Sequence, residues 1–236
     1  MFWLGQIISS LGSSITSFAL PLLVFSLTGS AFNLALSTTL TLLPYLCFGL
    51  IIGAWVDRVD RRRLMIGTDI ARALAIALIP LLDWLGMLTE AIYLVIVINA
   101  TLAIGFDAAG FAALPNLVHP DELVTTNGRM QAGYSTAAIA GPLIAGLLLA
   151  VLALPLLLLG DALSFLISAA SLASIRSSFT SSGGAAPATS ISQAIGEGLW
   201  YVVSHPLIRW IIPLSLIVNF VVTPLGRVKQ YGSIQE

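Results

Sequence analysis

The feature that most constrains the fold is a long N-terminal stretch without charged residues. No Asp, Glu, Lys or Arg occurs from Phe2 to Val56. One crossing of a bilayer takes about 20 consecutive apolar residues, so this stretch is long enough for two crossings. Thr28, Gly29 and Ser30 supply a turn between them. The chain is therefore expected to be an integral membrane protein that begins with two transmembrane helices.

The composition supports helices in a bilayer rather than a soluble domain. Hydrophobic residues make up 58% of the chain and charged residues 9%, whereas soluble domains carry about 25% charged residues. Runs that are apolar on every side exclude barrel strands, which alternate in polarity. A net charge of −1 gives no support for a nucleic-acid partner. Cys47 is the single cysteine, which excludes an internal disulfide and a cysteine-based metal site, and no metal or cofactor is predicted.

Continued along the chain, the apolar runs predict six transmembrane helices followed by a linker and a seventh helix. The six helices are expected near 3–26, 33–56, 64–84, 91–113, 127–152 and 155–175. A segment rich in Ser, Gly and Ala, 176–206, is interpreted as a flexible cytoplasmic linker. A seventh span is expected over 207–226, and the polar tail 227–236 is interpreted as a truncation. The fold class is thus an all-α membrane bundle of six helices over 1–175.

The distribution of arginine predicts the orientation. Apart from Arg72, the arginines of the predicted six-helix region and its end lie in or next to loops on one side, at Arg58, Arg61, Arg62, Arg63, Arg129 and Arg176. The loops expected on the other side, near 27–32, 85–90 and 153–154, contain no Lys or Arg. Cytoplasmic loops carry the excess of positive charge. We therefore expect a multi-pass protein of the cell membrane with a cytoplasmic N-terminus.

The segment from Gly53 to Arg63 carries the most specific motif in the chain. It places a glycine, an acid followed by arginine, and a basic run in the order G-x-x-x-D-R-x-x-R-R-R. This resembles the loop motif between helices 2 and 3 of the major facilitator superfamily, except that Asp60 stands where the family has glycine. The resemblance implies a cytoplasmic gate latch formed by Gly53, Asp57, Arg58, Arg61, Arg62 and Arg63. A plain positive-inside anchor is the alternative.

Helix 5 carries a second resemblance. Gly128, Gly141, Pro142 and Gly146 fall at the spacing of the glycine-rich exporter motif of the same family. Ordinary close packing of membrane helices through small residues is the competing interpretation. Further stretches, such as 26–30, 112–115 and 161–165, resemble the branch of macrolide-type and siderophore exporters. The resemblance therefore implies a secondary active exporter of drug or siderophore type.

An internal echo supports this fold. Elements around Gly12, Phe18 and Pro21 recur around Gly105, Phe111 and Pro115 with offsets of 93 or 94 residues. Transporters of this superfamily nest two inverted three-helix repeats in each half, so helix 1 should correspond to helix 4. The expected architecture is one such half, built from 3+3 repeats.

Ionisable residues inside predicted spans are costly and are treated as functional candidates. Asp69 and Arg72 lie three residues apart on one helical face, so they can pair, most simply as part of the cytoplasmic gate. Asp107 has no close partner in sequence and is the candidate cavity acid, for a proton or a cation, although pairing with Arg72 is an equal alternative. Polar candidates for the same cavity are Gln6, Asn99 and Tyr134.

These observations predict export of a small, amphipathic molecule by alternating access. The expected partners are a small-molecule substrate and the lipid bilayer, and protons are the candidate coupling ion of an antiporter. A departure weakens that last point, because helix 4 lacks the arginine found in proton-coupled drug antiporters. An enzyme is not predicted, since neither histidine lies in a span and the intramembrane acids are scattered. The alternative function is a truncated, non-transporting fragment of such a transporter.

Overall fold

The structure is a computed structural model that describes residues 2–175, 179, 191–211, 213 and 214. The chain divides into two compact units, Met1–Pro187 and Ala188–Glu236. Each unit is considered by itself below. The first contains the six predicted helices and the candidate site.

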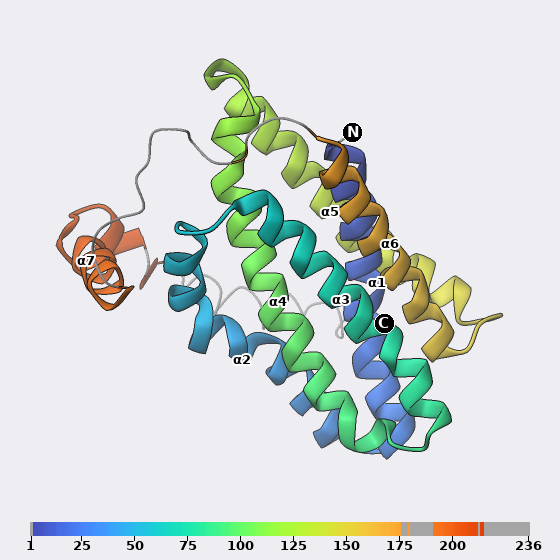
Figure 1. Cartoon of the computed structure of the whole chain (residues 1–236). Coiled ribbons are helices and arrows are strands. Elements are labelled where there is room, and N and C mark those ends of the chain that lie inside the picture. Colours follow the sequence, from blue (N-terminus) through green and yellow to red (C-terminus); the bar gives the residue numbers. More distant parts are fainter. Residues whose placement is uncertain (1, 176–178, 180–190, 212, 215–236) are drawn as a thin grey trace, which may run out of the picture. The chain divides into compact units, whose positions relative to one another are not determined.

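Unit 1 is a bundle of six long helices (Figure 1). Its helices are α1 (Phe2–Thr28), α2 (Ala31–Val56), α3 (Arg61–Trp84), α4 (Leu88–Leu117), α5 (Leu123–Leu148) and α6 (Leu154–Ser174), with a short 3₁₀ turn at Pro120–Glu122. The predicted all-α bundle is therefore confirmed. The boundaries of α4 and α5 differ from expectation: α4 runs four residues further, and α5 ends four residues earlier.

Five of these helices are long and apolar enough to cross a bilayer. They are α1 from Gly5 onward, α2, α3, α4 and α6. Helix α5 has 26 residues, which is sufficient length. Its first half carries polar residues such as Asn127, Arg129 and Gln131, which lower its apolar character. The sixth crossing therefore remains a prediction.

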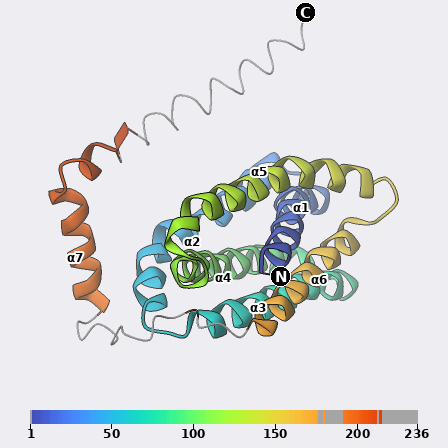
Figure 2. The same ribbon diagram turned by 90° about the horizontal axis from the view of Figure 1, so that it is seen from above.

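The helices are arranged so that α1 contacts both α5 and α6, while α3 lies against α4 and α6 and α2 lies against α4 (Figure 2). Two glycines make the turns possible at one end of the bundle. Gly29 has a φ of 62° and Gly86 a φ of 70°, a region that favours glycine. The break after Thr28 lies where the sequence predicted it.

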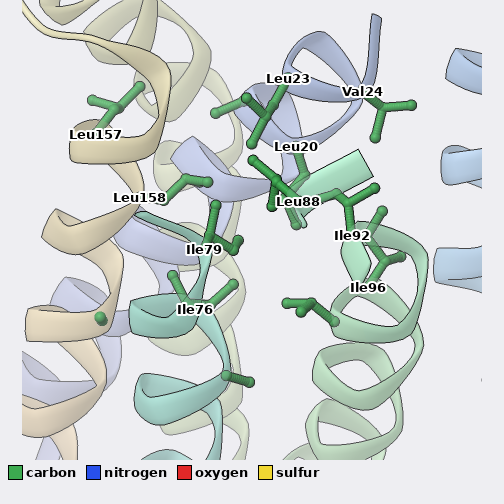
Figure 3. Packing of buried hydrophobic residues seen from close by; sticks show 14 of the residues in the cluster. Leu20, Leu23, Val24, Ile76, Ile79, Leu88, Ile92, Ile96, Leu157 and Leu158 are labelled. Atoms are coloured by element: carbon green, nitrogen blue, oxygen red, sulfur yellow. The ribbon is translucent and has the colours of Figure 1, made fainter. Parts of the chain in front are cut away.

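Two apolar clusters hold unit 1 together. The larger one joins α1, α3, α4 and α6 through branched side chains, which include Leu20, Leu23, Val24, Ile76, Ile79, Leu88, Ile92, Ile96, Leu157 and Leu158 (Figure 3). The smaller one contains Val56, Met65, Phe106, Ala109, Ala113, Leu172 and Phe179. Along α3, Met65 belongs to one cluster and Ala73 to the other. Asp69 and Arg72 lie between them, so the helix carries its charges through the middle of the bundle.

Unit 2 contains α7 (Ile191–Ser204), which corrects the interpretation of 191–204 as part of a flexible linker. Residues 176–178 and 180–190 of the predicted linker, 176–206, lie outside the described residues. That interpretation followed the Ser, Gly and Ala content near residue 183. It overlooked apolar residues at helical spacing from Ile191 through Ile195 to Val202. Of the predicted seventh span, 207–226, the structure describes only 207–211, 213 and 214, and residues 208–211 are helical. The rest of that span and the tail 227–236 lie outside the described residues.

Candidate functional site

A cavity of about 520 Å³ opens on the inner faces of the helices of unit 1. Helices α1 to α5 all contribute to its wall. The polar lining residues are Gln6, Ser9, Ser10, Ser13, Ser14, Tyr45, Arg72, Asp107, Asn127, Gln131 and Tyr134, and the apolar ones include Phe106, Phe111, Leu114 and Met130. A wall of this mixed character suits a ligand with both apolar and polar parts.

Three of the four predicted cavity residues line this space. They are Gln6 on α1, Asp107 on α4 and Tyr134 on α5. Asn99 is not among the lining residues, but it accepts a hydrogen bond of 3.2 Å from the Arg72 guanidinium, which does line the cavity. Helices α1 and α4 both contribute predicted residues to the wall.

Asp107 is the acid of the cavity. Its side chain is exposed within unit 1, and its Oδ2 accepts a hydrogen bond of 3.1 Å from the Tyr45 hydroxyl on α2. The sequence did not single out Tyr45. The available signal was an isolated phenol one residue after Pro44 in an otherwise apolar helix. The phenol orients the carboxylate and leaves its negative charge in place.

Arg72 is fixed by neighbours from three other helices. Besides Asn99, its guanidinium donates to Ser13 Oγ at 3.3 Å, and its Cζ lies 4.0 Å from the centre of the Phe165 ring. No ion pair within 4.0 Å joins Arg72 to Asp69 or Asp107 among the residues that the structure describes. Arg72 therefore forms no close ion pair with either Asp69 or Asp107, the two pairings that the sequence offered. Its guanidinium donates hydrogen bonds to Asn99 and Ser13 instead.

The acids nevertheless act on Arg72 at longer range. Its charge interacts electrostatically with Asp161, Asp69 and Asp107, in decreasing order. Asp161 lies on α6 and is 1% exposed, a fully buried position that the sequence did not indicate. Its Oδ1 accepts a hydrogen bond of 2.9 Å from the Ser164 hydroxyl. The guanidinium thus interacts with the cavity acid and with two buried acids.

The predicted gate motif forms the end of α2 and the start of α3. Arg61 donates to the carbonyl of Ala112 on α4 at 2.9 Å and contacts Asp57 at 3.4 Å. Arg62 donates to the carbonyl of Leu172 at 3.0 Å and to that of Ala173. These two carbonyls belong to the last turn of α6, where carbonyls lack helical partners. The loop arginines therefore cap and hold other helices of the same unit.

The remaining residues of the motif face outward or shape the turn. The Arg63 side chain is 89% exposed and lies 3.8 Å from Asp60. The backbone of Arg58 closes a turn onto Trp55 at 3.0 Å. Within the described residues nothing lies within 4 Å of a Cβ built on Gly53, so this glycine is not required by a close helix contact inside unit 1.

Asp60, which replaces the glycine of the family motif, has a structural role of its own. It is the N-cap of α3, and its Oδ1 accepts from the backbone N–H of Arg63 at 2.9 Å. Its φ of −65° is open to any residue. The turn therefore needs no glycine, and an N-capping aspartate is favoured there.

Asp57 leads to a first prediction. Asp57→Asn is expected to leave insertion and thermal stability unchanged, because the Asp57 side chain is 59% exposed and a solvent-exposed ion pair contributes less than about 1 kcal/mol. Transport by a full-length transporter containing this half is expected to be lost, since the carboxylate is available to a partner outside the unit. Efflux from cells, with expression checked by blot, measures this. If the Asp57→Asn transporter exports at the parental rate, Asp57 has no role in the gate.

The glycines of α5 divide into two kinds. A Cβ on Gly141 would collide with Ser14 on α1, whose backbone carbon lies only 3.0 Å away. Gly128 and Gly146 have nothing within 4 Å in the part of the chain that the structure describes, and Pro142 lies inside the helix. Gly12 of α1 makes an equally close approach to Asp161 and Ser164 on α6. Helix α1 is thus held closely on two sides.

No group of three or more His, Cys, Asp or Glu side chains that could hold a metal ion occurs among the described residues.

The chain matches the family model of the Major Facilitator Superfamily over residues 2–228. Macrolide efflux protein A of Streptococcus pyogenes is 30% identical over 175 residues, which are 74% of this chain and 43% of that protein. Multidrug efflux pump Tap of Mycobacterium tuberculosis is 32% identical over 154 residues, 62% of this chain and 36% of the pump. Tap of Mycolicibacterium fortuitum is 28% identical over 228 residues, 92% of this chain and 55% of the pump.

The chain therefore spans about half the length, or less, of these curated relatives. No solved structure gives a significant match. The family match covers nearly the whole chain and agrees with the all-helical bundle and its five apolar spans. This chain is a membrane protein that belongs to the major facilitator superfamily, a family of transporters.

Proposed function

We propose that unit 1 is the first half of an exporter that moves a small, amphipathic molecule across the membrane by alternating access. The observation that carries the proposal is the cavity on the inner faces of α1 to α5, with an acid and an arginine in its wall. Transporters of this superfamily place the substrate between two six-helix halves near the bilayer midplane. The relatives named as macrolide and multidrug efflux proteins support export as the direction.

The wall of the cavity favours a substrate with a positive charge. Phe106, Phe111 and Leu114 offer an apolar surface, and Asp107 offers a carboxylate beside it. The positive charge of Arg72 is already engaged by Asn99, Ser13 and the Phe165 ring. A cationic amphipathic molecule is therefore the class that this wall fits. Protons are the candidate coupling ion, since a carboxyl group of this unit can hold a proton when no substrate is bound.

A second prediction tests this assignment. Asp107→Asn in a full-length transporter containing this half is expected to lower efflux of a cationic dye at least about tenfold, since a lost charge pair in a closed site costs 2 kcal/mol or more and about 1.4 kcal/mol is tenfold. Efflux of a neutral dye is expected to fall much less. Asp83→Asn, at the exposed end of α3, is the matched control. Equal loss for both dyes would rule out charge recognition by Asp107.

The orientation gives a third prediction. Positive residues concentrate in the loop at Arg58 to Arg63, which by the positive-inside rule faces the cytoplasm and places the N-terminus there in the cell membrane. Reporter fusions after Arg63 and after Gly184 are expected to read cytoplasmic. An external signal at either position contradicts the six-span topology, and with it the crossing assigned to α5.

The alternative is a chain that does not transport by itself, because the substrate site of this family needs walls from two halves. Reconstitution of the 236-residue chain in vesicles distinguishes the two. Saturable, protein-dependent dye flux above that of empty vesicles would show that this chain, alone or as a dimer, suffices.

A further inference from the structure

Behind the cavity wall, α1, α3 and α6 enclose a layer of buried polar side chains, which we term the polar seam. Its members are Thr16, Asp69, Arg72, Asp161, Ser164 and Ser168, each no more than 7% exposed. Asp69 and Ser168 are 0% exposed. Helices in a membrane gain little from burying such groups, and ionisable ones are costly there. A seam of this size therefore calls for a role.

The charges of the seam do not balance. Asp69 and Asp161 carry two negative charges when ionised, and Arg72 carries one positive charge. Of the two acids, Asp161 has the stronger electrostatic interaction with Arg72. A buried charge without full compensation is strongly destabilising. The seam is thus short of one positive charge, and Asp69, with neither carboxylate oxygen hydrogen-bonded in the described residues, is the acid left over.

The hydrogen bonding around Asp69 also shows that a partner is missing. Neither of its carboxylate oxygens makes a hydrogen bond of acceptable geometry in the described residues, although Ser168 lies beside it. Buried polar atoms are nearly always paired, so such an exception points to a missing ligand. Asp161 differs in one of its two oxygens: the Ser164 hydroxyl donates to its Oδ1 at 2.9 Å, whereas its Oδ2 has no hydrogen-bond partner in the described residues.

We propose that Asp69, with the Ser168 hydroxyl beside it, binds one monovalent cation, either a proton or Na⁺, behind the wall of the substrate cavity. Either ion neutralises the leftover carboxylate. One carboxylate and hydroxyl oxygens provide too little negative charge for a divalent ion next to Arg72. Bound as a proton, the cation turns the carboxylate into a carboxylic acid, whose O–H can donate to Ser168 Oγ.

The site has a route to the cavity. Gln6 lines the cavity, and its Nε2 donates to Ser168 Oγ at 3.3 Å. Gln6 itself is 4% exposed, so its side chain must move for a cation to pass from the cavity to Ser168. The cation thus has an entry from the space that the substrate occupies.

Arg72 connects the cation site to the substrate site. It lines the cavity and interacts electrostatically with Asp69 and Asp161 in the seam, and with Asp107 and Tyr45 across the cavity. Asp69 itself is attracted by Arg72 and repelled by Asp161. When the cation leaves, the attraction of the seam for the guanidinium increases, and the hold of Arg72 on Asn99 and Ser13 weakens. Cation binding at Asp69 and substrate binding at Asp107 are therefore coupled through one side chain.

This inference extends the proposed function, because the cation is offered as a coupling ion of export. Its test measures binding by the purified 236-residue chain in lipid nanodiscs and requires no transport. Failure of transport and failure of cation binding are thus separate outcomes.

The sodium arm follows thermal unfolding at about pH 9, where most carboxylates are ionised. Replacing choline chloride with NaCl at constant ionic strength is expected to raise the unfolding temperature by about 2–4 °C if Na⁺ is the ligand. Asp69→Asn abolishes the increase, and Asp83→Asn, on the same helix but exposed, retains it.

The proton arm applies if NaCl has no effect. The infrared C=O stretch of a protonated carboxyl is expected in the parent chain at about pH 7 and to be absent from Asp69→Asn. It remains in Asp83→Asn and in Asp107→Asn. Ser168→Ala keeps the band but shifts its frequency, because the hydrogen-bond partner of the carboxyl is lost. Should Asp69→Asn fail to fold, the Ser168→Ala shift still reports on the site.

The proposal is overturned if the parent chain shows neither the sodium-dependent increase nor a protonated carboxyl band. It is also overturned if either signal persists unchanged in folded Asp69→Asn. A band that disappears in Asp107→Asn instead moves the cation to the cavity acid and contradicts the assignment to the seam.

Discussion

Arg72→Met is expected to destabilise unit 1 by about 3–5 kcal/mol, the cost of removing one partner from a buried set of charges. Arg72 is 7% exposed and is the positive charge that faces Asp69 and Asp161, which are 0% and 1% exposed. Methionine has a similar length, so loss of packing against Phe165 contributes little. Denaturant unfolding of the 236-residue chain in mild detergent measures the change.

Two further variants separate charge from packing. Arg63→Met is the matched control, because the Arg63 side chain is 89% exposed and should be neutral within about 0.5 kcal/mol. Adding Asp161→Asn to Arg72→Met is expected to recover part of the loss, since it removes one of the two uncompensated acids. If Arg72→Met and Arg63→Met unfold alike, the polar seam does not depend on the guanidinium charge.

Gly141→Ala is expected to cost about 1–3 kcal/mol, the usual range for extra volume in a tight contact. The added methyl would collide with Ser14, and the backbone carbon and the next nitrogen of α1 lie 3.0 and 3.2 Å away. Backbone atoms cannot turn aside, so α1 and α5 must separate. A shift of the unfolding midpoint in the same detergent assay reports the cost.

Gly146→Ala, five residues further along α5, provides the comparison. Nothing in the described structure lies within 4 Å of its added methyl, and alanine favours the helix by about 1 kcal/mol. It is expected to be neutral or stabilising in the isolated chain. Equal destabilisation by both substitutions would show that the contact with Ser14 does not control the effect.

The helices of unit 1 could be predicted because each is an apolar run of bilayer length bounded by polar residues. That signal is one-dimensional and requires no knowledge of neighbours. Helix α7 was missed because its helical spacing begins at Ile191, after a stretch whose Ser and Gly content suggested a linker. Helix α5 shows a different limit of prediction from apolar runs. Its 26 residues form a helix, but Arg129 and Gln131 weaken the apolar character that marks a membrane span.

The site was only partly within reach of the sequence. Gln6, Asp107 and Tyr134 stand out as polar residues in apolar runs, and they share one cavity. The partners of Arg72 could not be inferred, because Ser13 and Asn99 are 59 and 27 residues away. The burial of Asp161 could not be inferred either, because it depends on the packing of α6 against α1 and α3.

The arginines at the start of α3, next to the loop after α2, have a mechanical consequence for unit 1. The first three helices are joined to the next three by a short connection after Trp84, at the opposite end of α3 from this loop. Two three-helix blocks that are connected at one end only could separate at the other end. Arg61, on Ala112 of α4, and Arg62, on Leu172 of α6, close the other end. The two blocks are thus connected at both ends. They can tilt together as one body, but they resist separation from each other.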